Sequence, residues 1–441
     1  MLAKTDPFNP WALDDEGEHP KSSMEWWCAE AFFSSNFDKK KWSVKADFMQ
    51  WCAKTGVHGS MYNLRLFDFQ TGKHYIYDER DETQKLHITN NPFSAMFQDS
   101  FFQGAFPTYT IHCVDQKNDI ALDLSYNSSS YPHWVAQDIT GGFLPAGLGF
   151  YRYGFIPKNI LTGNLRIHDT TTKITGQGYI EHVYGDFSYH KLGAEQAGLH
   201  KTFSTYSKLI GWWMKNHAFH IPEKITLSTS NNPLGYDWMW GLLDNGWTLF
   251  YGNILFWIMQ GPIAGSLILS KDGKTYTEFS NVTFRYTAMR HAKEFNVLYP
   301  TGIEMTATNK KETLHLTVTT TDEPYEHTRK FTNEKFWKGF LIAEAPGTIQ
   351  GYYSDGKETI PLSGICKLEP QRQISKLGHN TLSITLLKPP KGIGKTIELD
   401  SSLLKKTCVM KVQLLPKPRI NFSMSRHANT VSSKKEVEDY S

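Results

Sequence analysis

The sequence predicts an all-β protein made of two tandem β-barrel or β-sandwich domains, with a short helical segment between them. Three observations lead to this fold class. Short segments alternate apolar and polar residues with a period of two, turn signals separate these segments, and few long windows show helical periodicity. The length of 441 residues is sufficient for two such domains, each with its own core.

The clearest strand predictions lie in the first third of the chain. Residues Trp42–Cys52 alternate as a half-buried strand does, and His58–Phe69 and Tyr109–Asp115 repeat the pattern. Short polar stretches predict tight turns at Gln70–Lys73, Asp115–Asn118, Lys271–Lys274 and Ser354–Lys357. This regular succession of strands and turns is typical of a sandwich or a barrel.

One stretch without charged residues, Leu249–Leu269, is long enough to span a bilayer. Asn253 and Gln260 interrupt it, and Gly261 and Pro262 follow, a combination that is typical of a turn. We therefore expect two strands joined by a turn rather than a transmembrane helix.

The main exception to the strand pattern is Lys201–His220. Apolar residues and a histidine recur there at spacings of three and four, at Phe203, Tyr206, Ile210, Trp213 and His217. Lysines at positions 201, 208 and 215 flank these residues. The interpretation remains open between a connecting helix packed on the rim of a barrel and an amphipathic lid or membrane-surface helix.

An internal similarity divides the chain into two parts. Residues Gly176–Glu181 and Gly364–Glu369 share the spacing from Gly to Glu, and 188 residues separate them. That separation suits one β-barrel domain. We expect an N-terminal domain at residues 1–190, a connecting segment at 191–232, a C-terminal domain at 233–424 and a polar flexible tail at 425–441.

Composition and charge argue against several classes of function. The net charge is +3 and Lys and Arg are dispersed, so no nucleic-acid partner is expected. The five cysteines form no CxxC pair and the 17 histidines are scattered, so we expect neither a disulfide framework nor a metal site. No nucleotide-binding or hydrolase motif stands in a supporting context, so no cofactor is expected.

Three motifs suggest a relationship. They are Met24–Trp27, Gly176–Gly185 and Trp238–Gly241, the last followed by Phe250 and Tyr251. In order and rough spacing they resemble the signatures E-W-W, G-x-G-Y-x-[DE]-H-x-W-G and W-x-W-G…D-G…Y-x-D of the lipocalin-like carotenoid 1,2-hydratases (hydroxyneurosporene synthases). The resemblance covers residues 24 to about 285 in motifs, and extends to about 370 in strand pattern.

The resemblance implies two tandem lipocalin-like domains and cofactor-free chemistry on a long apolar isoprenoid or polyene held among aromatic side chains. The hydratases add water to a terminal double bond, and relatives of the superfamily include tocopherol cyclases and fungal Diels–Alderases. A hydratase is therefore the main expectation. A cyclase or isomerase on the same scaffold, and a carrier that binds a hydrophobic ligand without chemistry, remain open.

The chain departs from the family pattern at two positions. It has Tyr184 where the family has Trp, and Asn253 where the family has Asp. A carboxylic acid can donate a proton to an alkene, whereas an amide cannot. The residue at 253 therefore puts the ordinary hydratase reaction in doubt and motivates the carrier hypothesis.

The candidate catalytic residues are Glu181, His182, Tyr184, Tyr251 and Asn253. Burial raises the pKa of a carboxyl, which makes Glu181 a candidate proton donor, with His182 as the alternative acid or as the group that orients Glu181 or water. Strand alternation puts Tyr179 and Glu181 on one face, and His182 and Tyr184 on the other.

The candidate substrate-binding residues are mostly aromatic: Glu25, Trp26, Trp27, Tyr179, Trp238 and Trp240. Aromatic faces stabilise a cation by about 0.5–2 kcal/mol each. Aromatic residues make up 14% of the chain, and 12 of the 13 Trp precede residue 258, which favours a localised pocket over general core filling. The hypothesis predicts a cavity with walls of Tyr184, Trp238, Trp240 and Tyr251, and with His182 or Glu181 at its end.

The first residues of the chain contain no apolar segment of the kind found in signal peptides. We therefore expect a cytoplasmic protein that meets a hydrophobic isoprenoid or polyene at the membrane surface. Residues 201–220 are the expected peripheral contact.

Overall fold

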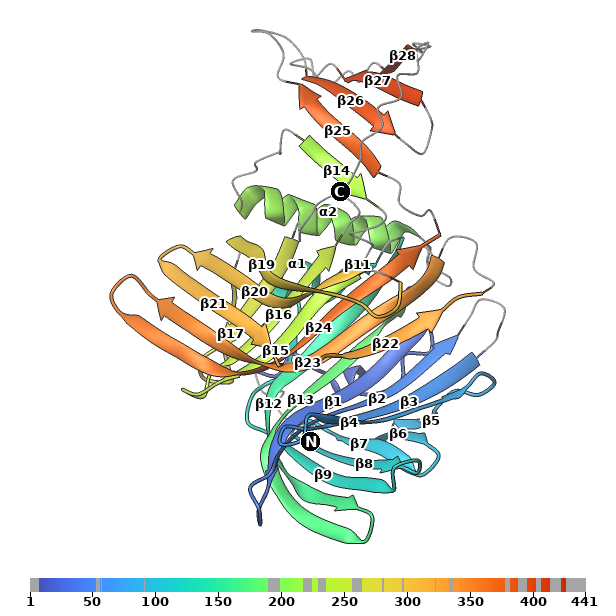
Figure 1. Ribbon diagram of the computed structural model, residues 1–441, viewed down its shortest axis with the longest axis vertical. Helices are drawn as coiled ribbons and strands as arrows, with labels where there is room; N and C mark the ends of the chain where they lie inside the picture. The colour runs from blue at the N-terminus through green and yellow to red at the C-terminus, as the bar shows by residue number, and fades with distance from the viewer. Residues whose placement is uncertain are drawn as a thin grey trace, which may run out of the picture.

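The computed structural model describes most of the chain. The described residues are 8–52, 56, 58–90, 92–146, 148–188, 199–216, 224–228, 235–255, 264–279, 281–295, 297–321, 323–332, 337–376, 381–387, 395–401, 406–412 and 422–425. They form three β-sheets and few helices, so the predicted all-β class is confirmed (Figure 1).

The first sheet has thirteen strands. They are β1 (Met24–Ser35), β2 (Lys41–Cys52), β3 (His58–Asp68), β4 (Lys73–Asp81), β5 (His87–Asn90), β6 (Phe93–Phe97), β7 (Ser100–Ala105), β8 (Thr108–Asp115), β9 (Ile120–Ser128), β10 (His133–Trp134), β11 (Phe143–Ala146), β12 (Gly149–Ile167) and β13 (Thr170–Asp186). The main order is β4-β3-β2-β1-β13-β12-β9-β8-β7-β6-β5. The sheet curls so that β3 approaches β6 and β8, and the concave side encloses the first hydrophobic core.

The second sheet has ten strands. They are β15 (Gly235–Leu243), β16 (Thr248–Leu255), β17 (Ala264–Ser270), β18 (Thr277–Phe279), β19 (Asn281–His291), β20 (Leu298–Asn309), β21 (Glu312–Thr320), β22 (Tyr325–Lys330), β23 (Trp337–Ser354) and β24 (Thr359–Ser375). Their order is β18-β17-β16-β15-β24-β23-β21-β20-β19, with β22 beside β23. This sheet also curls around its own core, so the protein has two lipocalin-like β domains.

The two domains share one arrangement of strands, as the internal similarity predicts. In the first, β13 lies between β1 and β12, and in the second β24 lies between β15 and β23. The repeated segments Gly176–Glu181 and Gly364–Glu369 lie in β13 and β24. Glu181 and Glu369 therefore occupy corresponding central strands.

A third, smaller sheet is additional to the two expected domains. It has the order β14-β25-β26-β27-β28 and appears at the top of Figure 1. Its strands are β14 (Lys224–Ser228), β25 (Thr381–Leu387), β26 (Lys395–Ser401), β27 (Lys406–Val412) and β28 (Phe422–Ser425). The boundaries drawn from the sequence at 190, 232 and 424 remain predictions.

The part of the chain that the structure describes contains one short 3-10 turn, η1 (Leu13–Asp15), and two α-helices, α1 (Gln137–Thr140) and α2 (Leu199–Asn216). Helix α2 confirms the helical periodicity of Lys201–His220 as far as residue 216. It contacts α1, β11 and β12, as expected of a connecting helix packed on a domain rim. Within the described ranges, no helix combines the length and apolar character needed to cross a membrane. Contact of residues 201–220 with a membrane surface stays a prediction.

The other local predictions can be compared directly with the strands. The four predicted turns each separate two successive strands. Leu249–Leu269 contributes to the antiparallel pair β16 and β17, and the turn predicted at residues 260–262 lies outside the described residues. The prediction of a half-buried strand at Trp42–Cys52 is wrong, because β2 is buried on both faces over most of its length. One face lies in the first core, and the other is covered by the second domain.

An apolar cluster forms where the domains meet. Its buried members are Phe32, Val135, Tyr153, Phe155, Tyr179, Val183, Trp238, Trp240, Leu242, Phe250 and Ile268. The Phe155 and Phe250 rings stack with centroids 4.4 Å apart, and the Trp240 indole donates a hydrogen bond of 2.8 Å to the Pro157 carbonyl. We call this group the interdomain cluster.

Beside the interdomain cluster lies a buried network of ion pairs. The Lys45 ammonium lies 3.0 Å from Glu344 and also pairs with Glu369 across the interface. Lys367 of the second domain lies 3.3 Å from Glu30 of the first. These pairs fix the domains relative to each other, because a buried charge without its partner is costly.

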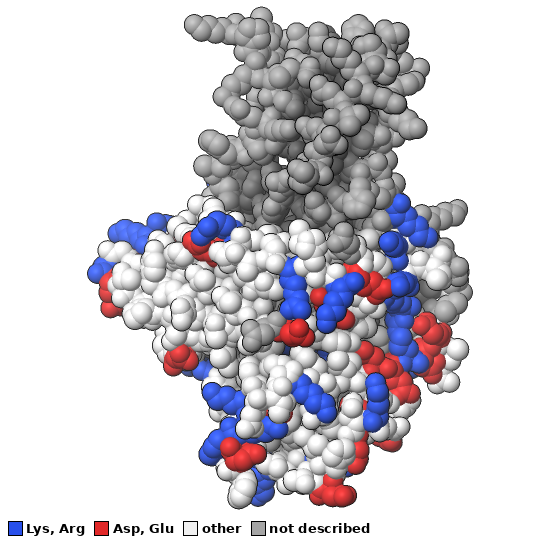
Figure 2. All heavy atoms as spheres, viewed as in Figure 1, with Lys and Arg blue, Asp and Glu red and all other residues white. Residues whose placement is uncertain are grey.

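At the surface, charges of both signs are interspersed. On the face shown in Figure 2, Lys and Arg lie close to Asp and Glu over most of the described surface, and several Lys and Arg follow one another along its right edge. This distribution fits the small net charge of +3.

The segment before β1 packs into the first domain. Trp11 lies 5.3 Å from Trp134, centroid to centroid, and Asp15 pairs with Arg152 at 2.6 Å. The Glu16 carboxylate accepts a hydrogen bond from the Tyr109 hydroxyl at 3.0 Å. Burial raises the pKa of Glu16 from 4.5 to about 7 despite this hydrogen bond. The folded protein therefore binds a proton at this site more tightly than the unfolded chain does.

This raised pKa predicts a pH dependence of stability. Between pH 4.5 and about 7 the folded state holds the Glu16 proton that the unfolded state releases, so the free energy of unfolding should fall as pH rises. Glu16→Gln should reduce this slope. Denaturant unfolding of both proteins at about pH 5 and about pH 7.5 measures it. An equal slope in the variant would show that Glu16 is not the group responsible.

Candidate functional site

The candidate site lies on β13, whose two faces look into different environments. β1 pairs with β13 so that Cys28 is opposite Glu181 and Trp27 is opposite His182. Paired residues of adjacent strands point to the same face. Glu181 therefore points to the interdomain cluster, whereas His182 points into the first domain. The predicted alternation is confirmed.

On the interdomain face, Glu181 is surrounded by hydrogen-bond donors. The Trp26 indole donates to one carboxyl oxygen at 2.8 Å, and the Tyr179 hydroxyl donates to the other at 2.9 Å. The Tyr153 hydroxyl donates to that second oxygen as well, and lies 3.1 Å from the Tyr179 hydroxyl. Tyr179 shares a face with Glu181, as strand alternation predicts, and Trp26 joins them, whereas Tyr153 was not singled out.

Burial raises the pKa of Glu181 above its ordinary value, although the charge of Lys45 and the hydrogen bonds from Tyr153, Trp26 and Tyr179 act in the opposite direction. At a given pH, the Glu181 carboxyl is therefore protonated to a greater extent than the carboxyl of an exposed glutamate. The tyrosine hydroxyls stay protonated, because burial and the nearby Glu181 raise their pKa values well above the ordinary range. This group can hold and release one proton among aromatic rings.

Aromatic rings from the second domain complete the surroundings of Glu181. The Tyr179 ring lies 5.4 Å from Trp238 and 5.4 Å from Trp240, which share a face of β15 as predicted. Among the described residues, the buried indole N–H of Trp238 has no hydrogen-bond partner. Buried donors are nearly always paired, so this N–H is one of the few exceptions among the described residues.

The interdomain cluster is not sealed on every side. Trp26, Tyr151 and Tyr236 are only partly buried and form its accessible edge. Tyr206 of α2 lies close enough to Tyr151 to influence the pKa of that phenol. Helix α2 therefore borders the accessible edge.

Two surface hollows lie elsewhere. One, of about 310 Å³, lies between α1 and α2 and is lined by residues that include Thr140, Phe143 and Lys201. The other, of about 400 Å³, is lined by residues that include Lys158, Gln177 and Lys271. Neither is lined by one of the predicted catalytic or substrate-binding residues.

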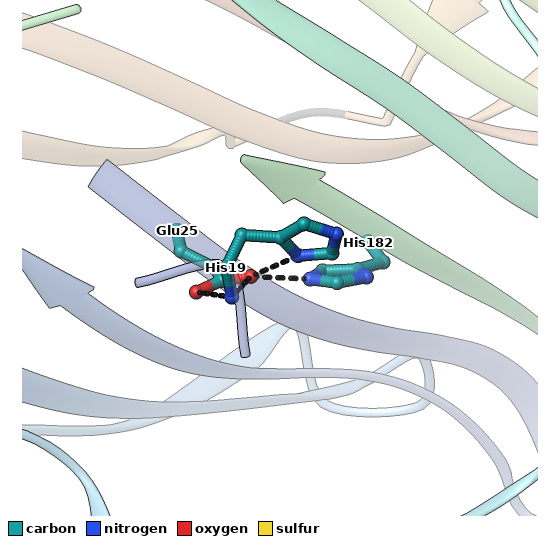
Figure 3. Close-up of side chains that lie close together, drawn as sticks. All are labelled: His19, Glu25 and His182. Carbon is teal, nitrogen blue, oxygen red and sulfur yellow. Dashed lines mark hydrogen bonds and ion pairs between the residues drawn. The ribbon is translucent and has the colours of Figure 1, made fainter. Parts of the chain in front are cut away.

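On the inner face, Glu25 and His182 form a second polar group with His19 (Figure 3). Glu25 Oε1 lies 2.8 Å from His19 Nδ1 and 3.0 Å from His182 Nε2. The backbone N–H of His19 donates to both Glu25 oxygens at 3.1 Å, and the Gln50 amide donates to Oε2 at 3.2 Å. Glu25 therefore anchors the segment before β1 and is not part of the interdomain cluster.

The inner group is enclosed by aromatic rings. The Trp27 ring stacks on His182 with centroids 4.7 Å apart, and Tyr184 stacks on His19 at 3.4 Å. Burial lowers the pKa of His182 despite the neighbouring Glu25. The predicted pairing of His182 with Tyr184 on one face is confirmed, their rings being 5.3 Å apart.

The structure does not bring the predicted residues into one cavity. Tyr184 belongs to the first core, Trp238 and Trp240 to the interdomain cluster, and Tyr251 to the second core beside Phe284. Asn253 lies in β16 opposite Asp237, and its side chain lies outside what the structure describes.

Sequence reasoning also missed several residues of the site. Tyr151 and Tyr153 are two residues apart on β12, and this spacing could have predicted that they share a face of the strand. His19 precedes the first strand, and no periodic pattern could have placed it beside His182.

Comparison with known proteins supports the fold. Neither a protein-family profile nor the sequence of a curated protein matches the chain. Among solved structures, kievitone hydratase from Nectria haematococca aligns with a TM-score of 0.55 at 10% identity, over 84% of this chain and 96% of that one. A protein provisionally named AttH from Nitrosomonas europaea aligns with a TM-score of 0.54 at 14% identity, over 83% and 98%. At these identities the similarity establishes a shared two-domain lipocalin-like fold.

Proposed function

We propose that this chain is a cofactor-independent enzyme that protonates a carbon–carbon double bond of a long apolar isoprenoid or polyene. Addition of water, as in carotenoid 1,2-hydratases, is the reaction we favour. The single observation that carries the proposal is the buried Glu181 carboxyl, which two tyrosine hydroxyls and an indole N–H hold within an aromatic cluster.

The reaction requires one acidic group and one water molecule. Glu181 gives its proton to one alkene carbon, and the other carbon becomes a tertiary cation. A water oxygen then bonds to the cation, and the proton that this water loses returns to the Glu181 carboxylate. The net change is alkene plus water to tertiary alcohol, with the acid restored and no other reactant consumed.

The aromatic surroundings suit the cationic intermediate. Tyr179, Trp238 and Phe250 belong to the cluster into which Glu181 points, and an aromatic face contributes about 0.5–2 kcal/mol to holding a cation. The unpaired Trp238 N–H supplies a donor for an oxygen of the substrate or of the attacking water. The partly buried Trp26, Tyr151 and Tyr236 form the accessible edge of the cluster, where we expect the substrate to enter.

Placing the acid at Glu181 removes one objection to hydration. The amide at Asn253 cannot donate the proton, but with Glu181 as donor no carboxyl is needed at that position. The same cation could also be captured by a second double bond of the substrate, which would give a ring. Hydration is favoured because a solved protein with this fold is named a hydratase.

The test is incubation of the purified chain with acyclic carotenoids, squalene and prenylquinones, followed by chromatography and mass spectrometry. We expect a product heavier than one of these substrates by the mass of one water. A product of unchanged mass and altered retention would indicate cyclisation or isomerisation instead. No product from any substrate, with the protein shown to be folded, would count against catalysis and favour a carrier.

A further inference from the structure

We propose that His19, Glu25 and His182 form a binding site for one divalent transition-metal ion, with Zn²⁺ as the best-suited candidate. This inference is independent of the proposed function, because these side chains lie on the face of β13 opposite Glu181. The widely separated histidines gave no such indication in the sequence. The site appears only when the segment before β1 meets β1 and β13.

The three ligand atoms converge on a small volume. Glu25 Oε1, His19 Nδ1 and His182 Nε2 all lie within 4.8 Å of one another (Figure 3). Glu25 Oε1 is 2.8 Å from the first nitrogen and 3.0 Å from the second. Tetrahedral bonds of about 2.0–2.2 Å to one ion would separate neighbouring ligand atoms by about 3.3–3.6 Å. The two measured separations are a few tenths of an ångström shorter, so a small outward shift of the rings would let an ion replace the hydrogen bonds.

The hydrogen bond of His182 to the backbone fixes which ring nitrogen is free. His182 Nδ1 lies 2.7 Å from the Asp15 carbonyl oxygen, which can only accept, so this nitrogen carries the proton. Nε2 of the neutral ring then presents a lone pair to the Glu25 carboxylate. Two lone pairs at 3.0 Å repel each other unless a proton or a cation lies between them.

The surroundings of the group also resemble those of protein metal sites. Metal-binding histidines commonly donate their second N–H to a backbone carbonyl, as His182 does. The His19 backbone N–H and the Gln50 amide hold the Glu25 carboxylate in place. Two histidines and one glutamate are a ligand set that zinc sites use, with further positions open to water.

An ion could reach the site from solvent, and its binding would affect the stability of the fold. The His19 side chain is 23% exposed, whereas Glu25 and His182 are almost fully buried, so His19 lies at the entrance. An ion there would fasten the segment before β1 to the centre of the first sheet. Metal binding should therefore stabilise the folded state.

The test uses the full chain after treatment with EDTA and dialysis. Titration with ZnCl₂, followed by calorimetry, should show one equivalent bound, and CoCl₂ should give visible absorption bands of a nitrogen- and oxygen-ligated ion. His19→Ala should weaken binding by at least about 100-fold, since a ligand is lost. This variant should fold, because His19 lies at the surface of the group. Glu25→Gln should have the same effect if it folds.

His168→Ala is the matched control, because His168 also faces a carboxylate but is 70% exposed and outside the site. It should bind zinc as the unmodified protein does. Absence of zinc binding by the unmodified, folded protein would overturn the proposal and leave a proton-bridged His–Glu–His group. Unchanged affinity in His19→Ala would overturn it equally. Because the readout is binding, failure of the hydratase proposal would not affect this result.

Discussion

Glu181→Gln is expected to abolish most turnover while leaving the protein folded and able to bind its substrate. Glutamine keeps the shape of glutamate; its oxygen can accept the hydrogen bond from the Trp26 indole, and its amide N–H can donate to the Tyr179 hydroxyl, which can also accept. It has no proton to give to an alkene. Loss of a general acid costs about 10²–10⁴-fold in rate. The rate constant and the substrate affinity, measured separately, check this expectation.

Glu369→Gln is the matched control for that experiment. Glu369 is a buried glutamate on β24, the strand that corresponds to β13, and the Tyr236 hydroxyl donates to it at 2.8 Å. Its other oxygen pairs with Lys45 rather than with a second hydroxyl. This variant should keep its turnover. Equal loss in both variants, or full turnover in Glu181→Gln, would contradict the assignment of Glu181 as the acid.

Lys45→Met should destabilise the protein strongly, by about 3–5 kcal/mol in the free energy of unfolding. Lys45 is buried between the domains, and its removal leaves Glu344 and Glu369 with less positive charge nearby. Methionine fills the space but supplies no charge. Denaturant or thermal unfolding measures the change.

Two further variants test the cause of that loss. Lys330 pairs with Glu294 at an exposed position, so Lys330→Met should leave stability unchanged. Combining Lys45→Met with Glu369→Gln should recover part of the lost stability, because one uncompensated carboxylate is removed with its partner. A loss below about 1 kcal/mol for Lys45→Met would show that the network is not what holds the domains together.

Much of the fold could be predicted from the sequence, because alternation with a period of two is a local property. The opposite orientations of Trp26 and Trp27, and of Glu181 and His182, follow from that alternation alone. The correspondence of β13 and β24 was visible in the repeated Gly-to-Glu spacing. These features needed no knowledge of the tertiary structure.

What could not be predicted depends on contacts between distant segments. The sequence pattern places Lys45 on the solvent-exposed face of a strand, and this residue is buried only because the second domain covers it. His19 reaches His182 through the packing of an irregular segment. Tyr184 and Trp238 both lie in the family-like motifs, but they belong to different hydrophobic clusters. This could not be predicted, because strand alternation does not show which part of the protein covers each face of a strand.

The central claim is that chemistry takes place at Glu181 between the two domains. A crystal structure of the Glu181→Gln variant with the isoprenoid or polyene that the unmodified protein consumes tests this most directly. We expect a substrate double bond beside position 181, against the rings of Tyr179 and Trp238. Substrate bound instead in the hollow between α1 and α2, away from residue 181, would contradict it.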